Sequence, residues 1–236
     1  MMAVTGEYSP MSVASELVKL LGYTPVQRKP YKRPYHDQTW LHHLLYFKEV
    51  YDLITDKEGE IVECGVGHGH SLYKLCLLAN YEGKGRKITA YDSFEGFPEP
   101  TKEDVSQQTA KKGQWKVSSP ESIRQLILEE GRMNKAFLDS TLTMIPGFFE
   151  NTMPHVKLRP IAFLHLDVDL YQSYLVTLRA LWPMVIEGGV VLFDEFDQQK
   201  CRDKFPGAEK SIAEFFGPRV SEMRYNKQAD RHYIIK

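Results

Sequence analysis

Residues 63–69, Glu-Cys-Gly-Val-Gly-His-Gly, decide the fold of this chain because they lie between an apolar run and a helix-like segment. Ile61-Val62 precede them, and residues 71–75 follow with a helix-like composition. The three glycines allow the backbone to turn sharply and to approach a ligand without a Cβ in the way. The first free N–H groups of the following helix then point at that ligand. The stretch therefore predicts a ligand-binding turn between a strand and a helix.

The spacing of the glycines narrows the kind of ligand. It is G-x-G-x-G, whereas a dinucleotide fingerprint is G-x-G-x-x-G, and His70 stands where the third glycine of that fingerprint belongs. This disfavours an NAD-dependent dehydrogenase. An acid two residues before the first glycine, with this spacing, resembles motif I of class I S-adenosylmethionine-dependent methyltransferases. On these residues alone, a glycine-rich turn that binds no ligand stays open as the alternative.

A second acid follows at the end of the next predicted strand. A polar link, residues 82–87, leads into Ile88-Thr89-Ala90-Tyr91 and then Asp92. A carboxylate at this point of an α/β unit commonly binds a ribose diol, because it can accept hydrogen bonds from both hydroxyls. Asp92 therefore indicates an adenosine-type ligand, although an acid that caps a turn is the simpler alternative.

Size, charge and cysteine content bound the class of protein. The 236 residues suit one substantial core with an appendage, and the 30 basic and 31 acidic side chains leave a net charge of −1. We therefore expect no nucleic-acid partner and no anionic membrane partner. Three widely spaced cysteines favour a reducing compartment over a disulfide framework. The N-terminus has no signal-peptide pattern and no apolar run approaches ~20 residues, so we expect a cytoplasmic protein.

The order of predicted elements indicates an α/β fold with a mostly parallel central sheet flanked by helices. Strands are expected at residues 61–64, 88–91, 141–145, 161–166 and 189–193. Helices are expected at residues 12–21, 37–53, 71–80, 120–130, 170–182 and 208–216, with a short one near 149–152. Residues 219–225 and 231–235 predict a C-terminal antiparallel hairpin. We divide the chain into an N-terminal helical arm and substrate-side cap (1–58) and a ligand-binding domain (59–236), with a polar lid at about 99–119.

Carboxylates gather at two further strand ends. Asp167 and Asp169 follow Leu166, and Asp194-Glu195 follow Phe193. Because open α/β sheets bind ligands at the carboxyl ends of their strands, Asp167, Asp194 and Glu195 should converge near the glycine loop. Clustered carboxylates repel one another, and a hard cation such as Mg²⁺ relieves that repulsion through oxygen ligands. The alternative is that each acid caps a helix, which we favour for Asp169.

Five stretches together resemble the successive motifs of the macrocin O-methyltransferase (TylF-type) family: IVECGVGHGHS, AYDSFEGFPEP, MIPGFFENTMP, LHLDVDLYQS and GGVVLFDEF. The resemblance covers roughly residues 60–217. It implies a Rossmann-like class I methyltransferase fold and a metal-dependent enzyme that uses S-adenosylmethionine to methylate a hydroxyl of a sugar or glycosylated small molecule. It also implies a homo-oligomer.

The resemblance assigns roles to individual positions. The implied cofactor-binding residues are Glu63, Gly65, Gly67, Gly69, Ser71, Asp92, Ser93, Phe94 and Gly147. The implied ligands of Mg²⁺, or of another divalent cation, are Asp167, Asp194 and Glu195. The family usually has two aspartates at the last pair, so Glu195 is a departure that puts ligation at this position in doubt.

A second departure concerns the general base. Relatives of known mechanism use a histidine from the segment after the DSFEG motif, and residues 97–154 contain no histidine here. His165 is the base that we place first, with His68, His70 and His155 as further candidates, and Asp167 could serve if no metal binds. Two other functions stay open, namely a metal-independent small-molecule methyltransferase and a non-catalytic S-adenosylmethionine-binding protein of the same fold.

Overall fold

The apolar run before the glycine loop forms β1 (Glu60–Cys64), an inner strand of a seven-stranded sheet. The computed structural model describes residues 37–106, 108–157, 159–197 and 203–236. β1 pairs in parallel with β2 (Ile88–Asp92) on one side and with β4 (Ile161–Leu166) on the other. All six residues of β4 are buried, as expected for a strand covered on both faces.

The complete sheet has the order β3-β2-β1-β4-β5-β7-β6. Its remaining strands are β3 (Leu142–Pro146), β5 (Val185–Phe193), β6 (Arg224–Asn226) and β7 (Arg231–Ile235). The first five strands run parallel, whereas β7 is antiparallel to β5 and to β6. The prediction of a mostly parallel sheet with a C-terminal antiparallel hairpin is thus confirmed. From β1 the chain continues to β2 and β3 on one side of the sheet and then crosses to β4 on the other side of β1. This change of direction places a topological switch point beside β1.

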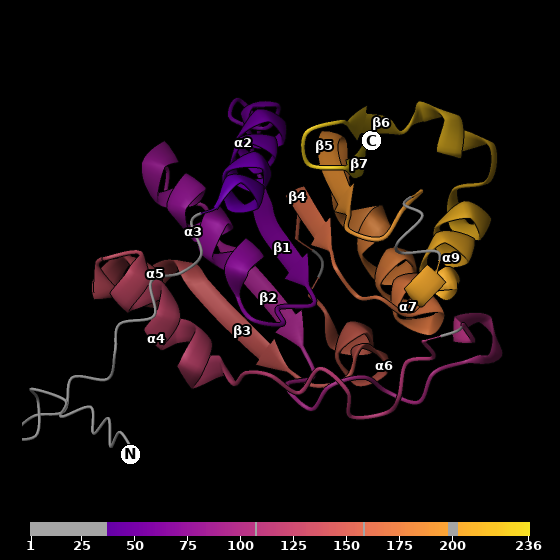
Figure 1. Ribbon diagram of the computed structural model, residues 1–236. Helices are drawn as coiled ribbons and strands as arrows, with labels where there is room; N and C mark the ends of the chain where they lie inside the picture. Colours follow the sequence, from indigo (N-terminus) through magenta and orange to yellow (C-terminus); the bar gives the residue numbers. More distant parts are fainter. Residues whose placement is uncertain (1–36, 107, 158, 198–202) are drawn as a thin grey trace, which may run out of the picture. The chain divides into compact units, whose positions relative to one another are not determined.

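Helices cover both faces of the sheet (Figure 1). One face packs against α2 (Gln38–Asp52), α3 (His70–Glu82), α4 (Pro120–Glu130) and α5 (Lys135–Thr141). The other packs against α6 (Phe149–Thr152), α7 (Tyr171–Leu181) and α9 (Pro206–Phe216), together with short 3₁₀ turns at Met153–His155, Trp182–Met184 and Gly217–Glu222. The two apolar layers that result hold the strand ends rigidly at one edge of the sheet.

The aromatic helix α2 belongs to this core. Its side chains Tyr46, Phe47, Val50 and Tyr51 are buried, and Asp37 begins the helix by accepting a hydrogen bond from the Trp40 backbone N–H at 2.8 Å. Residues 36–236 form one compact unit. The predicted helix at 12–21 lies outside the described residues, and the boundary at residue 58 stays a prediction.

One local prediction was wrong, and one helix was missed. The expected strand at 219–225 is a 3₁₀ turn as far as Glu222, and β6 keeps only three residues. Pro218 at the start of that turn fixes φ and removes a backbone donor, which favours the turn over a strand. Helix α5 was not predicted at all, although Asn134 begins it by accepting a hydrogen bond from the Ala136 N–H at 2.7 Å.

The predicted lid, residues 99–119, is anchored rather than loose. It contains a 3₁₀ turn at Lys102–Asp104, and Asp104 is almost fully buried. The Asp104 carboxylate accepts hydrogen bonds from the Thr101 N–H and from the Tyr171 N–H, both at 2.8 Å. Ser118 Oγ donates to the Gly67 carbonyl at 2.6 Å at the other end of the segment. The segment therefore connects the start of α7 to the glycine loop.

Two further features concern the cysteines and the lengths of the helices. Cys64 and Cys76 are buried free thiols, and burial raises the pKa of each. Among the helices in the described ranges, none is long and apolar enough to cross a membrane.

Candidate functional site

A cavity of about 720 Å³ lies where β1, β2, β4 and β5 end. Its lining includes Gly65, Asp92, Asp167 and Asp194, which follow or end these four strands. This is the edge at which the sequence predicted a ligand site. Residues that sequence reasoning did not assign to a site also line it: Thr39, His42 and His43 from α2, Trp115 from the lid, Lys204 and Phe205 before α9, and residues 228–231 of the C-terminal hairpin.

The glycine loop requires its glycines for a geometric reason. Gly65 has φ +85° and lies so close to the Asp167 carbonyl that a Cβ would overlap it. Gly69 has φ +82° and begins α3. Gly67 has φ +50° but no atom within 4 Å of an added Cβ, so the space beside it is open. The close approach of the loop to the β4 end is therefore fixed at Gly65, and the open side faces the cavity.

Asp92 holds this loop in place. One of its oxygens accepts hydrogen bonds from the backbone N–H groups of Val66 (2.7 Å) and Gly67 (3.2 Å), and the other accepts from the Phe94 N–H at 2.7 Å. A carboxylate has about four acceptor positions, so capacity remains for a ligand hydroxyl. Asp92 lines the cavity, as do Ser71 and Ser93.

Some implied cofactor residues do not reach the cavity. Four of the implied residues, Glu63, Gly69, Phe94 and Gly147, are not part of its lining. Phe94 is buried with φ +53°, and Gly147 packs against Thr152 while its N–H donates to the Asp92 carbonyl at 2.9 Å. These positions shape the walls behind the cavity, whereas Phe148, Phe149 and Glu150 line it in place of Gly147.

His165, the first candidate base, was wrongly placed by sequence reasoning. Its side chain is 3% exposed, its Nδ1 lies 2.9 Å from Glu63 Oε1, and its ring packs edge-on against Phe47. Neither His165 nor Glu63 lines the cavity, because both point toward the α2–α3 face of the sheet. Burial lowers the pKa of His165, but the Glu63 carboxylate more than offsets this and leaves the pKa raised. His165 is therefore a buried partner of Glu63 and not a group that can touch substrate.

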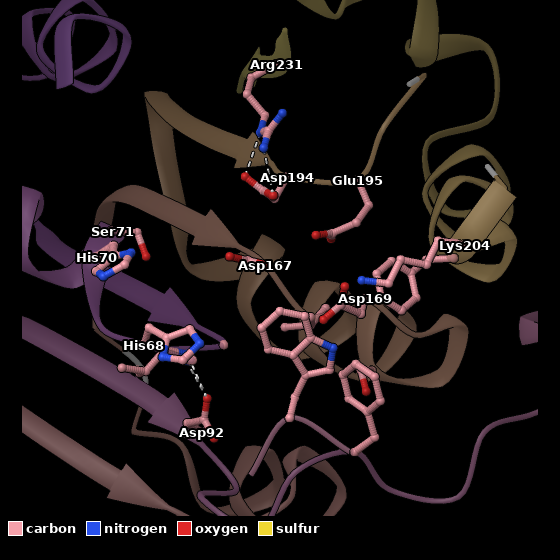
Figure 2. A pocket seen from close by; sticks show the side chains of 18 of the residues that line it. His68, His70, Ser71, Asp92, Asp167, Asp169, Asp194, Glu195, Lys204 and Arg231 are labelled. Carbon is pink, nitrogen blue, oxygen red and sulfur yellow. Dashed lines mark hydrogen bonds and ion pairs between the residues drawn. The ribbon is translucent and has the colours of Figure 1, made fainter. Parts of the chain in front are cut away.

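The acidic cluster, Asp167, Asp194 and Glu195, forms as predicted. One carboxylate oxygen from each lies within 4.8 Å of the others. Backbone bonds between neighbouring strand ends align two of them: Asp167 N donates to the Cys64 carbonyl and Asp194 N to the Leu166 carbonyl, both at 3.0 Å. Figure 2 shows the cluster on one side of the cavity, with Arg231 above Asp194 and the glycine-loop side chains opposite.

The cluster carries a strong electrostatic conflict. Burial and the Asp194 charge raise the pKa of Asp167 to about 7, and burial with the neighbouring acids raises the pKa of Glu195 well above its usual range. Burial also raises the pKa of Asp194, but the Arg231 guanidinium outweighs it and the pKa is lowered. Tyr174 Oη donates to Glu195 Oε2 at 2.5 Å. Three carboxylates that repel one another suit a divalent cation with oxygen ligands. The residues present therefore fit the divalent cation that the resemblance implies.

Asp169 does not cap α7. The residue that begins this helix is Leu170, and the N–H of Tyr171 is satisfied by Asp104 from the lid instead. Asp169 has φ +58°, lines the cavity and lies near Lys204 (Figure 2). A left-handed conformation in a non-glycine residue is costly and is often found at functional sites.

Of the other histidine candidates, two reach the cavity. His68 and His70 line it, with their rings stacked at 5.9 Å, whereas His155 borders a separate cavity of about 460 Å³. Sequence reasoning missed His43, whose only signal was the unusual histidine content of α2. Burial, followed by the Arg231 charge, lowers the pKa of His43 to about 4, so its imidazole is neutral at physiological pH.

Trp115 extends from the lid across this site. Its ring packs edge-on against His68 with 6.0 Å between ring centroids, and Lys204 Nζ lies 5.1 Å from the centroid of the same ring. The side chain is 42% exposed, so one part of the ring stays open to the cavity and to solvent. The lid thereby contributes an aromatic surface between the glycine loop and the segment before α9.

Comparisons with known proteins agree with this geometry. Residues 43–210 match the family model described as Macrocin-O-methyltransferase (TylF). The 8-demethyl-8-(2,3-dimethoxy-alpha-L-rhamnosyl)-tetracenomycin-C 4'-O-methyltransferase of Streptomyces olivaceus is 30% identical over 149 residues, which are 61% of this chain and 56% of that protein. The mycinamicin III 3''-O-methyltransferase of Micromonospora griseorubida is 27% identical over 149 residues, 61% of this chain and 58% of that protein. The alignments thus span little more than half the length of these relatives.

Solved structures show the same fold. The calicheamicin methyltransferase CalS11 superposes with a TM-score of 0.68 at 22% identity, covering 100% of this chain and 99% of that chain. The O-methyltransferase NovP also gives a TM-score of 0.68, at 20% identity, with 83% of this chain and 80% of that chain covered. The predicted Rossmann-like class I methyltransferase fold is therefore confirmed.

Proposed function

Because the chain belongs to the macrocin-O-methyltransferase (TylF) family, we propose that it transfers the methyl group of S-adenosylmethionine to a hydroxyl group of a sugar or glycosylated small molecule. We propose that a divalent cation, Mg²⁺ or a similar ion, assists the transfer. The name of one relative gives 4'-O-methylation of a compound that carries a rhamnosyl sugar. The name of another gives 3''-O-methylation of mycinamicin III. Sugar hydroxyls are thus the acceptor class that relatedness supports.

The observation that carries the proposal is one cavity with the glycine loop and Asp92 on one side and the acidic cluster on the other. A volume of about 720 Å³ suits a ligand of drug size. Gly67 leaves its side of the loop open for close approach, and Asp92 has spare acceptor capacity for a ribose hydroxyl. The donor's sulfonium end would then lie beside Asp167, which contacts Gly65 directly through its carbonyl.

The residues of this chain would act mainly by placement. Methyl transfer is an in-line displacement that needs the acceptor oxygen about 3 Å from the methyl carbon. Asp167, Asp194 and Glu195 would hold the cation, which when bound lowers the pKa of a coordinated hydroxyl. Trp115 and Lys204 would border the acceptor and limit water at the site. His43, neutral and at the cavity wall, is better placed than His165 to receive the hydroxyl proton.

The proposed test uses ion removal and one matched pair of variants. Treatment with EDTA should abolish methyl transfer to a panel of glycosylated acceptors, and added Mg²⁺ should restore it. Asp194→Asn should reduce turnover by on the order of 100-fold or more, since it removes a charged ligand, while Asp56→Asn, at a carboxylate that is 79% exposed, should leave turnover unchanged.

Two outcomes would favour the other candidates. Turnover that is indifferent to both EDTA and Mg²⁺ would identify a metal-independent methyltransferase. Tight S-adenosylmethionine binding in calorimetry, without turnover on sugar and phenol acceptors, would identify a non-catalytic binding protein. Two features favour this alternative: residues 97–154 contain no histidine, and position 195 is a glutamate.

The remaining assignments extend the same proposal. We place the protein in the cytoplasm as a homo-oligomer, with residues 1–58 as the substrate-side cap and residues 99–119 as the lid. The anchoring of the lid by Asp104 and Ser118 supports a lid that moves as a braced segment rather than as a free loop.

A further inference from the structure

Arg231 is held against the acidic cluster from two directions. Its Nε and Nη2 donate to the two oxygens of Asp194, at 2.6 and 3.1 Å. Its Nη1 donates to the Asp230 carbonyl at 3.0 Å, which fixes the opposite edge of the guanidinium to its own hairpin. Both side chains are largely buried, with 17% of Arg231 and 27% of Asp194 exposed. Such a two-pronged ion pair is both strong and geometrically specific.

The ion pair with Arg231 occupies the Asp194 carboxylate, which a divalent cation would need as a ligand. Asp194 contributes one of the three oxygens that lie within 4.8 Å of one another. With both of its oxygens engaged by Arg231, an ion that binds Asp194 must share a carboxylate with a guanidinium. The fixed positive charge also repels a divalent cation at Asp194, and charges on largely buried side chains interact more strongly than in bulk water.

The same charge stabilises the cluster when no ion is bound. Arg231 places a positive charge within hydrogen-bond distance of both Asp194 oxygens. One of the three acids is thus compensated by the protein itself.

We propose that Arg231 is a built-in counter-cation that competes with the divalent ion for Asp194 and thereby sets the ion affinity of the acidic cluster. Arg231 is then a positioning residue that acts through Asp194. This inference rests on the metal site of the proposed function and adds what limits its affinity.

The test compares Mg²⁺ binding, measured by titration calorimetry, in the wild-type chain and three variants. Arg231→Met should bind Mg²⁺ on the order of ten-fold more tightly, since it removes a competing charge. Arg231→Lys keeps the charge but loses the two-pronged contact with Asp194, so its Mg²⁺ affinity should lie between those of wild type and Arg231→Met. Arg224→Met removes an exposed arginine from the same hairpin and should leave affinity unchanged.

The outcomes separate this inference from the proposed function. Mg²⁺ binding by wild type with equal or weaker binding by Arg231→Met overturns the role of Arg231 and leaves the metal site standing. Binding by Arg231→Met alone supports the role of Arg231 and removes the ion from the wild-type reaction. Absence of binding in both, with S-adenosylhomocysteine still bound, overturns both.

A second measurement follows Mg²⁺ binding in the wild-type chain itself. The Arg231 Nε–H resonance of the ¹⁵N-labelled wild-type chain, assigned by its loss in Arg231→Lys, should shift and saturate as Mg²⁺ is added. A resonance that stays fixed while calorimetry records Mg²⁺ binding would contradict competition at Asp194.

Discussion

The glycine loop and the acidic cluster border the same cavity, yet opposite forces hold them. In the loop, the backbone N–H groups of Val66 and Gly67 converge on Asp92, so the loop gains hydrogen bonds as the chain folds. In the cluster, like charges approach within 4.8 Å, and the fold raises the pKa of Asp167 and Glu195. The loop is complete by itself, whereas the cluster requires a counter-charge.

The largest expected effect tests the rigidity of the loop. Gly65→Ala should cost more than about 3 kcal/mol in the free energy of unfolding, because the Cβ overlaps the Asp167 carbonyl in a left-handed conformation. Gly67→Ala is the matched control: it has a similar φ but open space, and should cost about 1 kcal/mol. Urea denaturation measures both, and equal costs would show that the contact between Gly65 and β4 is not tight.

The second prediction tests the conflict in the cluster. The folded pKa of Asp167, about 7, exceeds its ordinary 3.8, so the folded chain holds a proton that the unfolded chain releases. The contribution of Asp167 to the free energy of unfolding should therefore fall as pH rises from about 4 to about 7, by about 2 kcal/mol after allowance for the partial exposure of this group. Asp169 and Glu195, whose pKa values are raised, change stability in the same direction, whereas His43, whose pKa is lowered to about 4, changes it in the opposite direction. The contribution of Asp167 is therefore the difference between wild type and Asp167→Asn.

Asp167→Asn supplies the check on that slope. The variant cannot bind the proton, so its free energy of unfolding in urea should fall less with rising pH over the same window than that of wild type, and it should lose turnover. A variant with the wild-type slope would assign the proton to another group.

A third, smaller effect concerns Trp115, whose ring packs against His68 of the glycine loop and lies beside Lys204. Trp115→Ala should raise KM for the acceptor by about ten-fold, corresponding to about 1.4 kcal/mol, through loss of an aromatic surface. Trp115→Phe should restore most of it. A change confined to S-adenosylmethionine affinity would instead place Trp115 over the donor.

The smallest effect tests how residues 99–119 connect the start of α7 to the glycine loop. Asp104→Asn leaves one acceptor oxygen where two serve Thr101 and Tyr171, and should lower the free energy of unfolding by about 1 kcal/mol. Glu103→Gln, beside it, should show no measurable change by the same denaturation assay. Loss of stability in Glu103→Gln alone would place the anchor elsewhere.

Local patterns were sufficient wherever a short range of chain decides the outcome. The strand-glycine-helix unit at residues 60–82 could be predicted because burial and the glycine conformations depend on neighbouring residues. The prediction for Asp169 failed because an acid just before a helix usually caps it. Here the Tyr171 N–H is capped instead by Asp104, which lies 67 residues before Tyr171 in the chain. His165 was misjudged because strand alternation does not say which face of the sheet borders a cavity.

The sequence by itself determined the α/β layering, the glycine loop, and the convergence of three acids at the carboxyl edge of the sheet. Periodicity and strand-end position are local properties that any parallel sheet translates into the same edge. Only the tertiary structure decided that Arg231, 37 residues from Asp194, pairs with it. It likewise decided that His43 and Trp115 reach the cavity while His165 does not. Those contacts depend on the sheet order and on helix packing, because they join segments that the sequence keeps far apart.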